Sequence, residues 1–104
     1  MTFSLSGHVA LVTGNSTGLG KAIGLTLGKA GAKVPVNYFN NSARAEKTLA
    51  EYQRAGIDTA FIRADVTTEA GVEELFRRTE AELGTVDIIV VNATCEQPLK
   101  RIEQ

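Results

Sequence analysis

The chain has 104 residues, of which 43% are hydrophobic and 22% are charged, and its net charge at pH 7 is −1. This composition is typical of one soluble globular domain and lacks the basic surplus expected of a protein that binds nucleic acid or an anionic membrane. No apolar run is long enough to span a membrane, and the first ten residues do not resemble a signal peptide, so we expect a cytoplasmic protein. The only cysteine, Cys95, and the only histidine, His8, exclude an intrachain disulfide and argue against a zinc site.

Strand-like and helix-like patterns alternate along the chain. Short apolar, β-branched runs predict buried strands, and apolar residues spaced by three and four predict helices. In chain order we expect a strand at 8–13, a helix at 19–30, a strand at 33–38, a helix at 42–55, a strand at 59–65, a helix at 68–83 and a strand at 86–92. Four strands joined by three helices predict an α/β fold with a parallel sheet and right-handed crossovers.

Each predicted helix is followed by a glycine. Gly31, Gly56 and Gly84 stand where a residue in the left-handed conformation commonly ends a helix. Pro35 conflicts with the second strand, because proline lacks the N–H group that a central strand donates to its neighbour.

The chain is expected to contain one domain and a short tail. Residues 1–94 hold all the predicted elements and include no linker or low-complexity segment. Residues 95–104, interrupted by Pro98, have no matching element to pack on. We expect this tail to be disordered or to take part in self-association.

The stretch "VTGNSTGLGKAIG" at 12–24 places three glycines between the first strand and the first helix. At such a junction the N–H groups of the helix N-terminus and the positive end of its dipole attract an anion, and glycine lets a phosphate approach the backbone. Gly14, Gly18 and Gly20 follow Thr13 with the spacing G-x-x-x-G-x-G, which differs from the usual dinucleotide motif G-x-G-x-x-G. A tight turn would explain the first two glycines, but the third favours a phosphate cradle.

The sequence "TGNSTGLG" resembles the T-G-x-x-x-G-x-G motif of the short-chain dehydrogenase/reductase family. The stretches "RADVT" at 63–67 and "ELGTVDIIVVNAT" at 82–94, with the spacings between them, are similar to the N-terminal half of classical members, particularly relatives of the 3-oxoacyl carrier-protein reductases. The resemblance implies a truncated, Rossmann-like, doubly wound parallel sheet of four strands in the order 3-2-1-4, with three helices.

The resemblance also implies the residues that bind a dinucleotide. Asp65, beside Val66, would bind the adenine amino group, although Asp65 could instead cap the helix expected at 68–83. Asn92 matches the asparagine of the family's N-N-A-G motif, in which Val91 and Thr94 replace the first and last residues here. The full expected set is Gly14, Asn15, Ser16, Thr17, Gly18, Leu19, Gly20, Asn37, Tyr38, Asp65, Val66, Asn92 and Ala93.

The end of the second predicted strand favours NADP(H) over NAD(H). Members that prefer NAD carry an acidic residue there to bind the ribose 2′-hydroxyl, whereas this chain reads "NYFNN" at 37–41. Thr17 replaces the basic residue that many NADP-binding members place in the glycine loop. Arg44 is then the nearest basic candidate for a 2′-phosphate, and Lys21 is a weaker one.

No catalytic residue is expected in these 104 residues. The family uses a tyrosine as general acid and base, a lysine four residues later, and a serine. Tyr38 and Tyr52 are instead followed at that spacing by Ser42 and Gly56. We therefore expect that the chain as given does not catalyse the hydride transfer of its parent family.

Three functions compete. The first is the nucleotide-binding half of an oxidoreductase; the second is a non-catalytic half-Rossmann module that associates with itself, and a flavodoxin-like FMN protein is a remote third. The fourth strand carries "IIVV" at 88–91 and would be an apolar edge with unpaired backbone groups. We therefore expect a homodimer or higher oligomer built through that strand, and no nucleic-acid or membrane partner.

Overall fold

The computed structural model describes residues 4–16 and 18–92, and it has the predicted alternation of strands and helices. In chain order the elements are β1 (Ala10–Val12), α1 (Gly18–Lys29), β2 (Val36–Tyr38), α2 (Ser42–Arg54), β3 (Phe61–Arg63), α3 (Glu69–Glu82) and β4 (Ile88–Val90). The helices agree with the predicted ranges to within one residue at each end. The expected tail, 95–104, lies outside the described residues.

Local side-chain chemistry accounts for where the helices begin and end. Asn41 caps α2 by accepting a hydrogen bond from the N–H of Arg44 at 3.0 Å, and Thr68 caps α3 in the same way. The predicted glycine stops are confirmed, because Gly31, Gly56 and Gly84 have φ angles of 114°, 80° and 114°.

The strands form two parallel pairs. β1 pairs with β4, with Ala10 opposite Ile88, and β2 pairs with β3, with Val36 opposite Phe61. Between β1 and β2 there is only an isolated bridge, from Val9 to Lys33.

Pro35 explains this interruption. It stands two residues beyond the bridge and has no N–H to continue the hydrogen-bond ladder toward β1. Both end pairs of the expected order 3-2-1-4 are therefore present, but the middle of that order is not a continuous ladder. The paired segments are three residues each. The predicted strands are longer because the prediction follows the apolar runs, and these runs continue beyond the residues that are paired.

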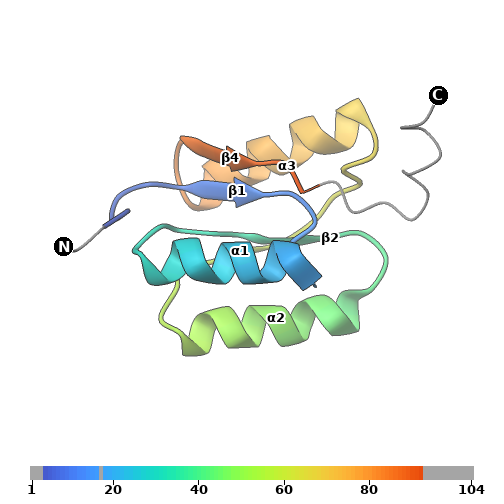
Figure 1. Ribbon diagram of the computed structural model, residues 1–104. Helices are drawn as coiled ribbons and strands as arrows, with labels where there is room; N and C mark the ends of the chain where they lie inside the picture. The colour runs from blue at the N-terminus through green and yellow to red at the C-terminus, as the bar shows by residue number, and fades with distance from the viewer. Residues whose placement is uncertain (1–3, 17, 93–104) are drawn as a thin grey trace, which may run out of the picture.

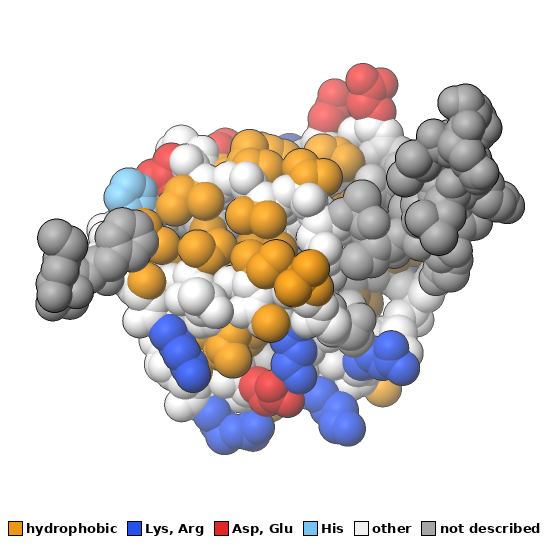
Figure 2. All heavy atoms as spheres, in the orientation of Figure 1, with side chains coloured by type: hydrophobic (Ala, Val, Ile, Leu, Met, Phe, Trp, Pro, Cys, Tyr) orange, Lys and Arg blue, Asp and Glu red, His pale blue; other side chains and the backbone are white. Residues whose placement is uncertain are grey.

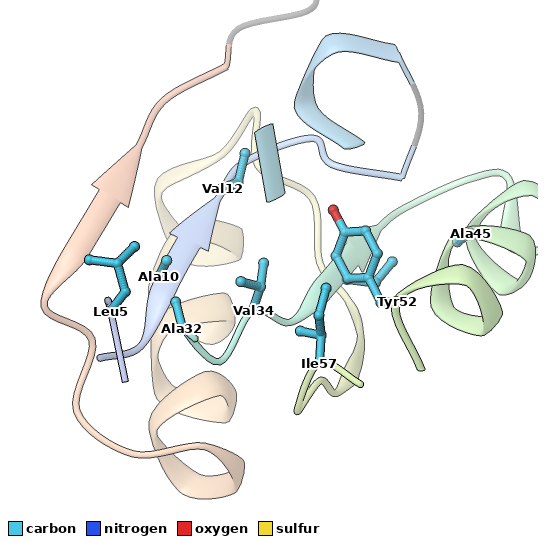
Figure 3. Packing of buried hydrophobic residues seen from close by; sticks show 9 residues of the cluster. Leu5, Ala10, Val12, Ala32, Val34, Ala45, Tyr52 and Ile57 are labelled. Atoms are coloured by element: carbon cyan, nitrogen blue, oxygen red, sulfur yellow. The ribbon is translucent and has the colours of Figure 1, made fainter. Parts of the chain in front are cut away.

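The strands lie between two helical layers, and Figure 1 shows α3 on the opposite side from α1 and α2. Alternation along β1 explains both layers: Ala10 and Val12 face one cluster, and Leu11 faces the other. The first cluster includes Val34, Ala45, Tyr52 and Ile57 (Figure 3). The second includes Ile62 and Leu75, under α3.

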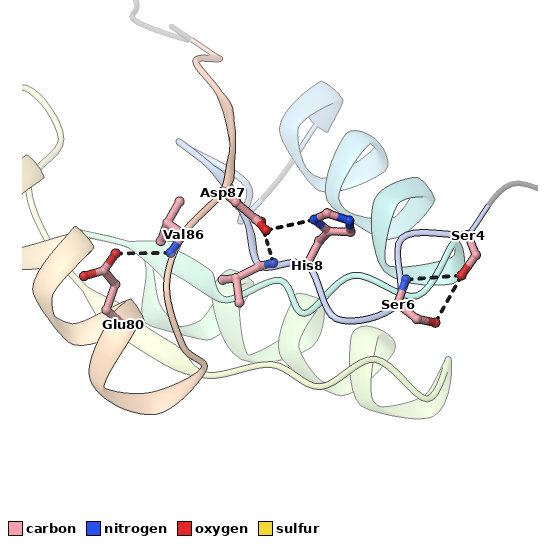
Figure 4. Close-up of polar contacts among 7 residues, drawn as sticks. Ser4, Ser6, His8, Glu80, Val86 and Asp87 are labelled. Carbon is pink, nitrogen blue, oxygen red and sulfur yellow. Dashed lines mark hydrogen bonds and ion pairs between the residues drawn. The ribbon is translucent and has the colours of Figure 1, made fainter.

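A polar contact joins the beginnings of β1 and β4. Asp87 accepts a hydrogen bond from the N–H of Val9 at 2.9 Å, and its other carboxylate oxygen lies 2.8 Å from Nδ1 of His8 (Figure 4). This contact holds His8 and Val9 next to Asp87, at the points where β1 and β4 begin.

One face of the molecule is apolar. Figure 2 shows hydrophobic side chains gathered over the upper part of the face that β1, β4 and α1 occupy in Figure 1. Ile89 and Val91 on and beside β4 are 52% and 74% exposed, and Leu19 at the start of α1 is 67% exposed. A shallow hollow lined by Leu19, Ala22, Ile23, Thr26 and Leu27 runs along α1.

Candidate functional site

The glycine-rich loop connects the end of β1 to the start of α1. Gly14 and Gly18 have φ angles of 66° and 63°, which favour glycine. A Cβ atom at Gly20 would overlap the carbonyl oxygen of Gly14 and the side-chain amide of Asn92. The first turn of α1 contains no acidic residue, so the loop leads into a helix N-terminus that can attract an anion.

Asn37 of β2 holds the start of this loop. Its Oδ1 accepts a hydrogen bond from the N–H of Gly14 at 2.8 Å, and its Nδ2 donates to the carbonyl of Val12 at 2.6 Å. Its side chain is buried, and these bonds connect β1 to β2 where Pro35 interrupts the ladder.

Asn15 completes the same network from the loop. Its side chain is buried; Oδ1 accepts a hydrogen bond from the N–H of Asn37 at 2.9 Å, and Nδ2 donates to the carbonyl of Pro35 at 2.9 Å. Asn15 and Asn37 were both predicted as cofactor-binding residues. Their side-chain amides are directed into the protein, where they fix the loop.

Asn92 braces the loop from the end of β4. Its N–H donates to Oγ1 of Thr13 at 2.8 Å, and its Nδ2 donates to the carbonyl of Gly14 at 3.3 Å. The loop is therefore attached on one side to β2 and on the other to β4, both at the carboxyl ends of their strands. In open α/β sheets this is the edge at which ligands bind.

Asp65 and Val66 follow β3 at the same edge of the sheet. Oδ1 of Asp65 accepts hydrogen bonds from the hydroxyl of Thr67 at 2.6 Å and from its N–H at 3.0 Å, which lower the pKa of the Asp65 carboxyl. Among the described residues, Oδ2 of Asp65 has no hydrogen-bond partner. The alternative role of Asp65 as a helix cap is wrong, because Thr68 caps α3.

Of the other predicted residues, some are described by the structure and two lie outside the described part of the chain. Tyr38 is half-buried, and its ring stacks on that of Phe61 with the centroids 4.5 Å apart. Ser16 is half-buried and its carbonyl accepts a hydrogen bond from Oγ1 of Thr48, whereas Leu19 projects toward solvent. Thr17 and Ala93, both predicted to bind the cofactor, lie outside the described residues, as does Thr94.

Two features of α2 were not predicted. Tyr52 is completely buried, and its hydroxyl donates to the carbonyl of Lys21 at 2.9 Å; burial raises the pKa of the Tyr52 hydroxyl to about 12. Glu51 forms an ion pair with Lys21 at 2.9 Å, and the hydrogen bond from Lys21 holds the pKa of the Glu51 carboxyl below its usual range. The helical spacing of Ala45, Leu49 and Tyr52 is a sequence signal for the burial of Tyr52, but nothing in the sequence pointed to the pair of Glu51 with Lys21.

Within residues 4–16 and 18–92, no group of three or more metal-ligating side chains occurs. None of the helices in this part of the chain combines the length and the apolar character needed to cross a membrane.

The family of proteins described as short chain dehydrogenase matches residues 8–104. A short chain dehydrogenase/reductase of Aspergillus aculeatus, AacuN, is 45% identical over 91 residues, which are 88% of this chain and 34% of that protein. The chain thus spans about a third of the length of this relative. A short-chain dehydrogenase/reductase homolog of Bacillus subtilis, YusS, is 43% identical over 86 residues, which are 83% of this chain and 79% of that shorter protein.

The fold is also shared with solved structures. A putative dehydrogenase from Burkholderia cenocepacia with bound NADP superposes with a TM-score of 0.77 at 36% identity. The match covers 88% of this chain and 36% of that one. The Rossmann-like fold expected from the sequence is therefore confirmed.

Proposed function

Because the chain belongs to the short-chain dehydrogenase family, we propose that it is the dinucleotide-binding portion of an oxidoreductase that transfers hydride between NADP(H) and a carbonyl or alcohol substrate. The observation that carries this proposal is the glycine loop, which is held at Gly14 by the side chains of Asn37 in β2 and of Asn92 just after β4. A loop that is already fixed loses little freedom when it binds a ligand. The dinucleotide, when bound, would supply or accept the hydride.

The described residues have distinct roles in this proposal. The loop from Gly14 to Gly20 would hold the phosphates through backbone N–H groups, while Asn15, Asn37 and Asn92 position it. Oδ2 of Asp65, which has no partner among the described residues, would accept a hydrogen bond from the adenine amino group. NADP is favoured over NAD because β2 ends without a carboxylate, and the neighbour from Burkholderia cenocepacia holds NADP.

These residues would bind the dinucleotide without catalysing hydride transfer by themselves. Tyr52 is buried with its hydroxyl bonded to Lys21, and Tyr38 stacks on Phe61. Neither tyrosine has a lysine four residues later. General acid catalysis requires the proton donor to reach the substrate, which the buried Tyr52 cannot do.

Calorimetric titration with NADPH and NADH tests the proposal. We expect NADPH to bind more tightly, and Gly18→Val to abolish binding because a side chain there obstructs the approach of the phosphates. Gly7→Val is the matched control: Gly7 also has a positive φ angle, 89°, but lies outside the loop. A folded wild-type chain that gives no heat with either dinucleotide would overturn the proposal and favour the non-catalytic module.

We also propose that the chain associates with itself through β4. Among the described strands β4 pairs on one edge only, with β1, and Ile89 and Val91 are exposed beside the free edge. Such an edge is a template for another strand. Sedimentation at tens of micromolar should show a dimer or larger species for the wild type and a monomer for Ile89→Lys, whereas a monomeric wild type would contradict this proposal.

A further inference from the structure

Tyr52 of α2 lies where α2, α1 and the glycine loop meet. Its side chain is completely buried, and Figure 3 shows its ring among the apolar residues of the first cluster. The hydroxyl at the end of this ring makes two polar contacts. It donates a hydrogen bond to the carbonyl of Lys21 in the first turn of α1 at 2.9 Å, and it lies 3.4 Å from Nδ2 of Asn15 in the loop.

The Tyr52 hydroxyl donates in one of these contacts and accepts in the other. Burial raises the pKa of the Tyr52 hydroxyl to about 12, so the oxygen keeps its proton at neutral pH. The carbonyl of Lys21 can only accept a hydrogen bond, so this proton is directed to Lys21. A lone pair of the same oxygen then accepts the hydrogen bond from Nδ2 of Asn15.

Asn15 extends this connection to β2. Its Oδ1 accepts a hydrogen bond from Nδ2 of Asn37 at 3.1 Å, and Oδ1 of Asn37 accepts one from the N–H of Gly14 at 2.8 Å. An unbroken series of side-chain hydrogen bonds therefore joins the N–H of Gly14 to the carbonyl of Lys21. In order, its members are Gly14, Asn37, Asn15, Tyr52 and Lys21.

The two ends of this series enclose the segment proposed to hold the phosphates. The backbone N–H groups of that segment lie between Gly14 and Lys21 in the sequence. Tyr52 is the member that connects the loop to the first turn of α1, and without its hydroxyl the series stops at Asn15. Hydrogen bonds in such a series polarise one another, so the loss of one weakens the others.

Gly24 provides the space for the Tyr52 hydroxyl. It lies in the interior of α1, where glycine is less favourable than alanine. A Cβ atom at Gly24 would overlap the hydroxyl oxygen of Tyr52 and would lie 3.1 Å from Cζ of the same ring. The glycine is therefore matched to the oxygen atom that it admits.

Resting on the proposed function, we propose that Tyr52 is a positioning residue for dinucleotide binding, whose hydroxyl fixes the loop against α1 so that the backbone N–H groups between them meet the pyrophosphate together. Tyr52 is buried and does not touch the ligand. A loop whose two ends are fixed loses less freedom when it binds. NADPH and NADH both carry the pyrophosphate, so the hydroxyl should favour both alike. Adenosine carries no phosphate and should gain nothing from it.

Calorimetric titration of Tyr52→Phe with NADPH and with NADH tests this role. The substitution keeps the buried ring and removes one oxygen atom, so we expect a folded chain that binds both dinucleotides about tenfold more weakly. Thr79→Val is the matched control. Thr79 also has a buried hydroxyl that donates to a helix carbonyl, that of Leu75 at 2.7 Å, but it belongs to α3 in the other helical layer (Figure 1). Thr79→Val should lower stability and leave both affinities unchanged.

A second substitution separates positioning from stability. Tyr52→Phe leaves space beside Gly24, so adding Gly24→Ala to this variant should raise its urea midpoint, because the methyl group fills the space and alanine favours the helix. The methyl group cannot replace the hydrogen bonds with Asn15 and Lys21. We therefore expect Tyr52→Phe/Gly24→Ala to be more stable than Tyr52→Phe and to bind both dinucleotides as weakly. Recovery of affinity together with stability would show that Tyr52 acts only by packing, and would overturn the proposal.

Two measurements by nuclear magnetic resonance complete the test. In the absence of ligand, the backbone amides of Gly14, Gly18 and Gly20 should exchange with solvent faster in Tyr52→Phe than in the wild type. The affinity for adenosine should be the same in both. An equal loss of adenosine affinity would show a general disturbance of the site and would contradict the role given to the loop.

Failure of this inference differs from failure of the proposed function. If the wild type binds a dinucleotide and Tyr52→Phe binds it equally well, the role of Tyr52 is overturned and the proposed function stands. If the folded wild type binds neither dinucleotide, the proposed function is overturned and the inference with it.

Discussion

Oδ1 of Asn37 accepts a 2.8 Å hydrogen bond from the N–H of Gly14, so a residue of β2 fixes the first glycine of the loop that follows β1. The buried amide of Asn37 also bonds to the carbonyl of Val12 and to Oδ1 of Asn15. One side chain therefore takes the place of the backbone ladder that Pro35 interrupts.

Asn37→Ala should lower the free energy of unfolding by about 2–4 kcal/mol, because it leaves the N–H of Gly14 and the buried carbonyl of Val12 without their side-chain partner. Urea denaturation measures this loss. Asn40→Ala, at an exposed asparagine nearby, should change stability by less than about 0.5 kcal/mol. Equal effects of the two substitutions would show that the Asn37 network does not hold the loop.

Gly20→Ala tests how closely the loop approaches α1. The added methyl group would overlap the Gly14 carbonyl and the Asn92 amide, so the loop must move or the substitution must destabilise the fold. We expect a loss of about 1–3 kcal/mol in thermal or urea unfolding, as for other overpacked sites. Lys29→Ala, in the last turn of the same helix, serves as the control. A stability equal to that of the wild type would contradict this packing.

The pair of His8 and Asp87 should make stability depend on pH. Hydrogen bonds with His8 and with the N–H of Val9 lower the pKa of Asp87 in the folded state. The contribution of Asp87 is therefore present above its unfolded pKa, about 3.9, and is lost as the pH falls through the lower folded value.

Asp87→Asn should accordingly be less stable than the wild type at pH 6, and the difference should shrink as the pH is lowered below 4. Urea unfolding at a series of pH values gives the profile. Asp58→Asn, at an exposed aspartate, should follow the wild-type curve. A difference for Asp87→Asn that stays constant from pH 6 downward would contradict the assignment.

Tyr52 should reduce stability in alkali. Its folded pKa is raised to about 12, so the folded state holds the proton more tightly than the unfolded chain, whose tyrosines titrate near 10. Its contribution is complete below pH 10 and is lost as the pH rises toward 12. Tyr52→Phe should flatten this decline, and ultraviolet titration of the variant should lack the late-ionising phenol. Tyr38→Phe, which keeps the stacked ring, is the control and should retain it.

Residues whose role depends only on their own backbone conformation are the ones that the sequence predicts best. The ends of the helices could be predicted from Gly31, Gly56 and Gly84, since each needs only a local left-handed conformation. The motif around Gly14 likewise identified the family. Pro35 conflicts with a continuous β2 on sequence grounds alone, but only the structure shows that the Asn37 side chain replaces the missing hydrogen bonds.

The side-chain roles were harder to predict because they depend on which elements meet in space. The amides of Asn15 and Asn37 could have faced a ligand or the interior, and only the packing of β1 against β2 decides between them. Lys47 looks like any solvated charge on a helix until α2 is placed beside the glycine loop. Predicting the polar hollow that Lys47 lines would have required the position of α2 relative to the glycine loop. The spacing of apolar residues along a helix does not give that position.

The parallel pairing of β1 with β4 has a consequence for how the chain comes to be folded. Ala10 meets Ile88, whereas β2 and β3 are neighbours along the sequence. As the chain emerges from the ribosome, β2 and β3 can join early, but β1 waits for β4, which is synthesised much later. Contacts between such distant residues form slowly because a long loop must close first. β1 is thus exposed to wrong partners for longer than β2 or β3, and the time needed to synthesise the chain from β1 to β4 sets the shortest duration of that exposure.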